Sequence, residues 1–286
     1  MNRTDRAEMR TLAVALLASL LLWNLPFGGL VLYPFKLLAT WLHELSHGIT
    51  MFLTGTGFDH IVIYRDTSGL AYQSTRPGPF ATAWIAAAGY MGTPLWGALV
   101  LVVTPTARAS RIALLVLAVL LGLSALLVID HGDDGFGPWS IAAIGGAFAI
   151  AAIVLPGRWR IAVAHFIAAQ ACVNALLDIR VLLRPSQVVN GQETGVSDAH
   201  NMAAATFSTT ETWAVWTWAV IWLAWSLLVL YIAIRLSGSR VLASVVPFDR
   251  ATASLPDESD HGEHRRSRET GPERTSPSGP AGTAKP

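Results

Sequence analysis

The residues best suited to chemistry in this chain are His43-Glu44-Leu45-Ser46-His47, which form an H-E-x-x-H motif. On a helix, residues four apart project from one face, about 6 Å apart along the axis. His43 and His47 could therefore be two ligands of one tetrahedral zinc ion, and Glu44 could act as the base on a zinc-bound water. The spacing thus predicts metal-assisted hydrolysis.

Apolar residues predominate on both sides of this motif, at 37–42 and at 48–53. Two histidines and a glutamate surrounded by hydrocarbon are costly unless they bind something or one another. The alternative interpretation is a chance match, or a set of polar residues that line a helix bundle. The free energy needed to keep such groups at membrane depth favours a metal site.

The composition is that of a membrane protein. Hydrophobic residues make up 52% of the 286 residues and charged residues 14%, whereas soluble domains carry about 25% charged residues. The net charge of +1 says nothing about nucleic acid, and because no basic-aromatic stripe appears we expect no nucleic-acid partner. Cys172 is the only cysteine, which excludes an internal disulfide and a thiolate zinc cluster.

The basic residues indicate the source of the chain. All but two of the twenty basic residues are arginine, and alanine is abundant, as is typical of GC-rich bacterial genomes. We therefore expect an integral, multi-pass protein of a bacterial cell membrane, in contact with the lipid bilayer.

The predicted fold is all-α and polytopic. Each apolar segment approaches the roughly 20 residues that a helix needs to cross a bilayer, which predicts six or seven transmembrane helices. Gly89, Gly92, Pro94 and Gly97 favour a bent or re-entrant element within one of these segments, at 81–103. The seven segments are 11–32, 36–55, 81–103, 111–129, 138–156, 160–183 and 212–236.

A catalytic zinc needs a third protein ligand and one open position. The strongest candidate is Asp178, which lies in the apolar segment 160–183 with Asn174 one helical turn earlier on the same face. An acid there is costly unless it coordinates or pairs. The alternative for Asp178 is an ion pair with Arg180 or Arg184 at the membrane surface.

Two other groups of acids are weaker candidates. A short connecting loop explains the acidic cluster at 130–134, because glycines surround it. Asp198 and His200 follow Val196-Ser197 and could begin a helix, with Ser197 or Asp198 as its N-cap.

The H-E-x-x-H motif in a membrane helix, the Ala-Gly-Tyr-Met-Gly element at 88–92, and Asn174 with Asp178 in a later helix appear together in this chain. Together they resemble the site-2-protease class of intramembrane zinc metalloproteases, and in particular its M50B-like branch. Ser197-Asp198-Ala199 is similar to a downstream stretch of that branch. The resemblance covers roughly residues 36–210.

This resemblance implies that zinc is bound by His43, His47 and Asp178, and that Glu44 is the base. It also implies hydrolysis of peptide bonds in membrane-embedded protein substrates. Asn174 could steady the oxyanion or the substrate backbone, although an interhelical hydrogen bond would explain it equally well.

The sequence departs from the family pattern at two positions. Ser46 stands where many relatives have glycine, and serine is small enough to keep helix packing close. The usual Leu-Asp-Gly around the third ligand reads Leu177-Asp178-Ile179. Because that glycine is missing, Asp198 is the alternative third ligand.

The predicted organisation has four parts: an N-terminal segment with the first membrane helix at 1–35, a metalloprotease-like core at 36–210, a last membrane helix with its flank at 211–248, and a disordered tail at 249–286.

Two alternative functions remain. A metal-ion transporter would need polar residues at matching depth on several helices. Apart from His43, Glu44, His47 and Asp178, the predicted helices carry almost no polar residues that could form such a path. A non-catalytic scaffold or regulator would not need Glu44.

Overall fold

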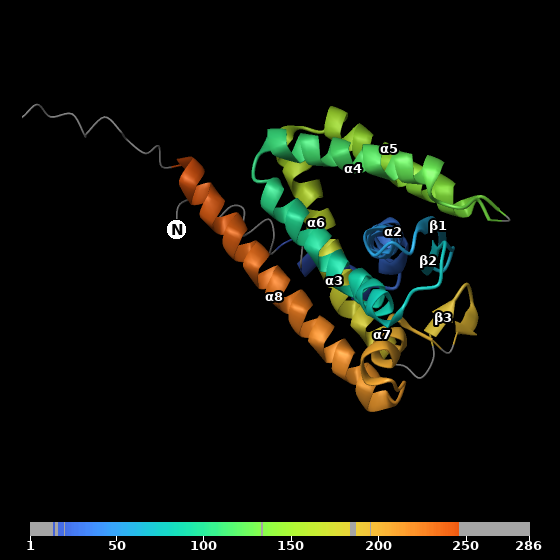
Figure 1. Ribbon diagram of the computed structural model, residues 1–286. Helices are drawn as coiled ribbons and strands as arrows, with labels where there is room; N and C mark the ends of the chain where they lie inside the picture. The colour runs from blue at the N-terminus through green and yellow to red at the C-terminus, as the bar shows by residue number, and fades with distance from the viewer. Residues whose placement is uncertain are drawn as a thin grey trace, which may run out of the picture. The chain divides into compact units, whose positions relative to one another are not determined.

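The computed structural model describes residue 14 and residues 17–19, 21–132, 134–183, 187–194 and 196–245. The tail expected to be disordered, 249–286, lies outside the described residues. Long helices dominate the described part, with two short β-hairpins between them (Figure 1). The helices are α2 (Gly28–Leu53), α3 (Pro79–Val103), α4 (Ala107–Leu127), α5 (Phe136–Val154), α6 (Gly157–Leu182), α7 (Asp198–Phe207) and α8 (Thr212–Val245).

Five helices in the described part of the chain are long and apolar enough to cross a membrane. They are α3, α4, α5, α6 and residues 212–237 of α8. This confirms the predicted all-α polytopic fold.

The number of membrane spans in the described residues is five or six, against the expected six or seven. The apolar segments 11–32 and 36–55 form a helical pair, Leu17–Asn24 and Gly28–Leu53, bent by 119°. If this pair counts as one span, the described residues contain six. The break falls at Pro26, which lacks a backbone donor and disfavours helical conformation in the residue before it.

The expectation of a re-entrant element at 81–103 was wrong, because α3 is one continuous helix with Pro94 inside it and is long enough to cross a membrane. Its glycines serve close packing instead. A Cβ atom on Gly92 would overlap Ser46 Oγ of α2, and one on Gly97 would lie 2.9 Å from Cys172 Sγ of α6. Small residues of this kind let membrane helices approach closely.

Two apolar clusters hold the helices together. The first joins α2 and the first hairpin to α4, α5 and α6, with Trp41, Leu121 and Ile141 fully buried. The second joins α3, α6, α7 and α8, with Tyr90 and Trp222 in its interior. The short helix α7 is thereby held against membrane-spanning helices, and its first residue lies close to α2.

The hairpins lie between the apolar segments, in stretches for which the sequence predicts no membrane helix. Strands β1 (Phe58–Ile63) and β2 (Gly69–Gln73) pair antiparallel, and so do β3 (Gln187–Val189) and β4 (Gln192–Thr194). β1 also forms a parallel bridge to Ile129 through Ile61. Within the described residues, β2 is therefore the free edge of its two-stranded sheet.

Candidate metal centre

Helix α2 presents the three polar residues of the H-E-x-x-H motif. The imidazole rings of His43 and His47 lie one turn apart, with centroids 4.8 Å apart and planes at 71°. Glu44 and His47 are buried, with 7% and 5% of their surfaces exposed. The predicted helical spacing of the motif is confirmed.

Asp198 lies directly across from the two imidazoles. Its Oδ2 is 3.1 Å from His43 Nε2 and 3.3 Å from His47 Nε2. Across the residues that the structure describes, these side chains make the one group of three or more His, Cys, Asp or Glu residues whose ligand atoms all lie within 4.8 Å of one another. Residues distant in the sequence thus converge on one point.

The start of α7 fixes the position of Asp198. Ser197 is the N-cap of this helix and forms a capping box with His200. The His200 backbone N–H donates to Ser197 Oγ at 3.4 Å, and the Ser197 backbone N–H donates to His200 Nδ1 at 3.3 Å. The reciprocal bonds satisfy two otherwise free N–H groups and hold the first turn of the helix. Of the two predicted N-caps, Ser197 is confirmed.

This donor set fits a zinc ion. Tetrahedral zinc with bonds of about 2.0–2.2 Å places its ligand atoms roughly 3.3–3.6 Å apart, close to the two distances from Asp198. His47 Nδ1 donates to the Ile85 carbonyl at 2.6 Å, which directs Nε2 toward the centre of the group. Such a bond from the second ring nitrogen is the usual way in which a protein orients a histidine ligand.

Helix α3 leaves room for the two imidazoles at Gly89. A Cβ atom there would overlap His43 Nε2 and would lie 2.5 Å from His47 Nε2. Behind His43, the Tyr90 ring makes an edge contact, with centroids 4.8 Å apart, and itself stacks on Trp222. The Gly-Tyr pair singled out in the sequence therefore shapes the wall of the metal centre.

Electrostatics favour an ionised Asp198. Burial alone would raise the pKa of this carboxyl, but attraction to His47 and hydrogen bonds from both histidines hold the pKa well below its usual range. An ionised carboxylate is the form that binds a metal ion.

Glu44 lies beside this group at the wall of a cavity of about 640 Å³. Strand β2 covers Glu44 closely, since a Cβ atom on Gly69 would lie 2.9 Å from Glu44 Cγ. The cavity is lined by the three motif residues, by β2, by Gln187 and Val189 of β3, and by Ser197, Asp198 and Asn201 at the start of α7. A water molecule and an extended peptide could both enter a space of this size and polarity.

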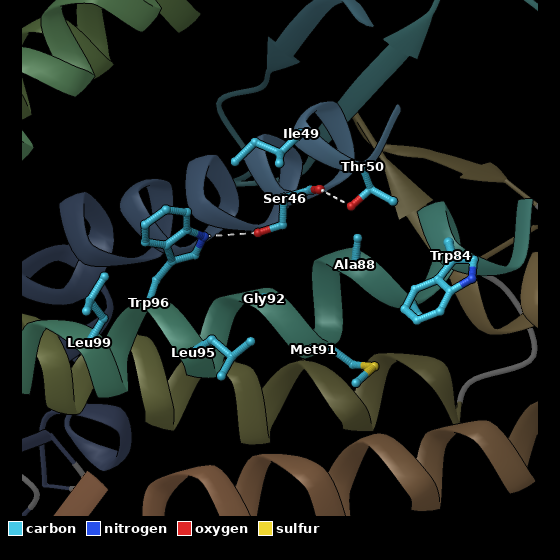
Figure 2. A pocket seen from close by; sticks show the side chains of 11 residues that line it. Ser46, Ile49, Thr50, Trp84, Ala88, Met91, Gly92, Leu95, Trp96 and Leu99 are labelled. Carbon is cyan, nitrogen blue, oxygen red and sulfur yellow. Dashed lines mark hydrogen bonds between the residues drawn. The ribbon is translucent and has the colours of Figure 1, made fainter. Parts of the chain in front are cut away.

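A second cleft, of about 530 Å³, lies between α2 and α3 (Figure 2). Its lining contains no histidine, acid or cysteine. Figure 2 shows Trp96 directing its indole N–H to Ser46 Oγ, while Leu95, Leu99 and Met91 form an apolar wall. This cleft has no groups for acid–base or metal chemistry.

Asp178, which the sequence favoured as the third ligand, does not belong to the group formed by His43, His47 and Asp198. It lies half-buried on α6, and the geometry favours the alternative, Asp198. The Asn174 side-chain amide donates to the Phe35 carbonyl of α2 at 3.4 Å. Of the two roles considered for Asn174, the structure therefore contains the interhelical hydrogen bond. The sequence signal for Asp198 was the Ser197-Asp198-Ala199 stretch that resembles the family, together with the missing glycine after Asp178.

Comparison with protein families finds a match for most of the chain. Residues 12–233, more than half of the chain, match the family described as Peptidase M50B-like. Comparisons with curated proteins and with solved structures find no match. The family match agrees with the resemblance read from the motifs, and the five apolar helices agree with a multi-pass integral membrane protein of a metalloprotease family. The chain therefore belongs to the Peptidase M50B-like family.

Proposed function

We propose that this protein is a zinc-dependent intramembrane protease that hydrolyses a peptide bond of a membrane-embedded protein substrate. The observation that carries this proposal is the convergence of His43, His47 and Asp198 beside the buried Glu44, at the wall of a polar cavity. Membership of a peptidase family supports the same reaction.

The zinc would be held by Nε2 of His43, Nε2 of His47 and the Asp198 carboxylate. When bound, zinc supplies a Lewis acid that polarises the scissile carbonyl and lowers the pKa of water to about 7. The chain's own contribution is to keep the His47 imidazole oriented, through the Ile85 carbonyl, and to keep Asp198 ionised.

Glu44 is the proton carrier in this proposal. Its carboxylate accepts a proton from the attacking water as the water oxygen bonds to the carbonyl carbon. It then delivers that proton to the amine nitrogen as the carbon–nitrogen bond breaks. No other acid lines the cavity besides Asp198, within the described part of the chain, which leaves Glu44 as the residue for this role.

The substrate has to be unwound at the scissile bond, because a helix shields its carbonyls and satisfies its own backbone groups. The free edge of β2 lies along the cavity and offers backbone donors and acceptors to an extended peptide. Strand addition of this type gives affinity without strong dependence on side chains. We therefore include the β2 edge in the proposed substrate site.

The two alternative functions have less support. A transporter would need further polar groups along a path, yet the described residues contain a single group of three metal-binding side chains. A scaffold or regulator would not require a buried glutamate beside that group.

The test is to purify the full chain in detergent and to compare the wild type with Glu44→Gln. We expect one zinc per chain in both proteins, and cleavage of reconstituted membrane-protein substrates by the wild type alone. Wild-type protein that copurifies without zinc, or a Glu44→Gln variant that still cleaves, would contradict the proposal.

A further inference from the structure

The turn between β1 and β2 contains a strained residue outside the metal centre. Thr67 has a φ of 70°, a conformation that β-branched residues rarely adopt. Such strain persists only where surrounding contacts enforce it, and it is common near functional sites. Here the Thr67 carbonyl accepts a hydrogen bond of 2.5 Å from Thr40 Oγ1. Because Thr40 lies one helical turn before Glu44, this contact joins the turn to the motif helix α2.

The same turn is bonded on its other side to the β3–β4 turn. The Gly191 backbone N–H donates to Asp66 Oδ2 at 3.0 Å, and the Asn190 backbone N–H donates to Ser68 Oγ at 3.1 Å. Asn190 and Gly191 both have positive φ, as in the two-residue hairpin turns that favour Asn-Gly. The two hairpins, far apart in the sequence, are therefore joined by hydrogen bonds between their turns.

Asp66 and Ser68 hold each other in place for this contact. Ser68 Oγ and the Ser68 backbone N–H both donate to Asp66 Oδ1, at 2.6 Å and 3.0 Å. Burial would raise the pKa of Asp66, but these bonds and the one from Gly191 lower it. The carboxylate is thus ionised at neutral pH and is a strong acceptor.

Both connections lead to the metal centre. Gly69 follows Ser68 directly and packs against Glu44. On the other side, β4 ends at Thr194 and α7 begins at Asp198 soon after. The turn is therefore attached on one side to the helix of the two histidines, and on the other to the hairpin that leads to their partner carboxylate.

We propose that the Asp66–Ser68 turn is a positioning element, which ties α2 to the β3–β4 hairpin and so holds Asp198 against His43 and His47. The inference rests on the proposed zinc site. Asp66 is a positioning residue in this proposal, and it acts on the metal centre only through the hairpin.

The experiment compares Asp66→Ala with Asp66→Asn in the full-length protein, and uses Asp59→Ala as a matched control. Asp59 is an exposed acid of the same hairpin, and its carboxylate contacts only the neighbouring His60 among the described residues. Two quantities are measured: amide hydrogen exchange of the metal-free protein over residues 187–200, and zinc affinity by competition with a chelator.

We expect Asp66→Ala to speed exchange from Asn190 through Asp198 and to lower zinc affinity about tenfold, the lower range for loss of a supporting contact. Asp66→Asn keeps one oxygen acceptor, which can serve Gly191 or Ser68 but not both, and should therefore restore only part of both quantities. Thr40→Val removes the other connection while keeping the side-chain shape, and should also lower zinc affinity. Asp59→Ala should change neither quantity.

Unchanged exchange in Asp66→Ala would overturn the inference, whether or not the protein binds zinc. Faster exchange with wild-type zinc affinity would also overturn it, because the turn would then hold the hairpin without positioning Asp198. Failure of the wild type itself to bind zinc would instead count against the proposed function, and the exchange measurement would still decide whether the turn holds the Asp198 segment.

Discussion

Two cavities flank helices α2 and α3, and they differ sharply in polarity. The cavity of about 640 Å³ contains His43, Glu44 and His47, whereas the cleft of about 530 Å³ contains Ser46 and Thr50 of the same helix. The hydroxyls in the cleft are satisfied by their own helix: Ser46 Oγ donates to the Leu42 carbonyl at 2.7 Å and Thr50 Oγ1 to the Ser46 carbonyl at 2.9 Å.

Imidazoles and carboxylates cannot be satisfied by their own helix in this way, so they need partners from elsewhere. On the cavity side these partners come from α7, from β2 and from the Ile85 carbonyl of α3. The α2 hydroxyls in the cleft do not depend on such partners, although Ser46 Oγ also accepts from the Trp96 indole N–H of α3. The rest of the cleft wall is apolar, as lipid chains are. One face of α2 is therefore built for chemistry and the neighbouring face for the bilayer.

The largest effects are expected from substitution of the metal-ligand and base candidates in the polar cavity. We expect His43→Ala or His47→Ala to abolish stoichiometric zinc binding and cleavage, because too few strong ligands remain. Glu44→Gln should keep the zinc and lower cleavage at least about 100-fold, the range for loss of a general base. Zinc content by mass spectrometry and cleavage in proteoliposomes measure the two effects separately. Full zinc occupancy in both histidine variants would show that the metal lies elsewhere.

The third ligand is the next test of the polar cavity. Asp198→Ala should weaken zinc affinity by more than about 100-fold, beyond the range for loss of a supporting contact. Asp178→Ala should change it little, because Asp178 lies outside the group of ligand atoms. Chelator competition on both variants gives the comparison. The reverse order of affinities would restore Asp178 as the ligand.

The sequence was sufficient for the two histidine positions because their relation depends only on helical spacing. For the third ligand it left Asp178 and Asp198 open, and only the folded chain shows that Asp198 lies beside the two imidazoles. The cost of burying an acid draws attention to Asp178 in a membrane helix, and it says nothing of Asp198 on a short helix outside the spans. The position of Asp198 depends on the path of the β3–β4 hairpin, which is fixed by contacts between distant segments such as Gly191 and Asp66.

The glycines of α3 show a second limit of sequence-based prediction. Glycine and proline can bend a helix, but glycine also lets two helices approach closely, and composition does not distinguish these roles. Gly89 and Gly92 take the second role, because α2 occupies the space that their side chains would fill. Helix pairing, which decides between the roles, is a tertiary property.

Gly89→Ala tests how closely the polar cavity is packed. The added methyl group would overlap His43, so we expect overpacking to cost about 1–3 kcal/mol of stability and to lower zinc affinity through the displaced imidazoles. Gly146→Ala is the matched control, since a Cβ atom there meets nothing within 4 Å. Thermal unfolding in detergent and chelator competition measure the two effects. Equal behaviour of the two variants would mean that α3 can move away from the histidines at little cost.

The smallest expected effect belongs to the apolar cleft. Trp96→Phe removes the hydrogen bond of 3.1 Å from the indole N–H to Ser46 Oγ but keeps an aromatic ring in the wall. We expect a loss of about 0.5–1.5 kcal/mol, the usual contribution of one hydrogen bond, and unchanged zinc affinity. Trp84→Phe in the same cleft is the control, because Trp84 is 55% exposed and should give a smaller change in the unfolding temperature. If Trp96→Phe weakened zinc binding as strongly as Gly89→Ala, the two faces of α2 would be coupled. The separation between the polar cavity and the apolar cleft would then fail, because a change at Ser46 would reach His47 through the helix they share.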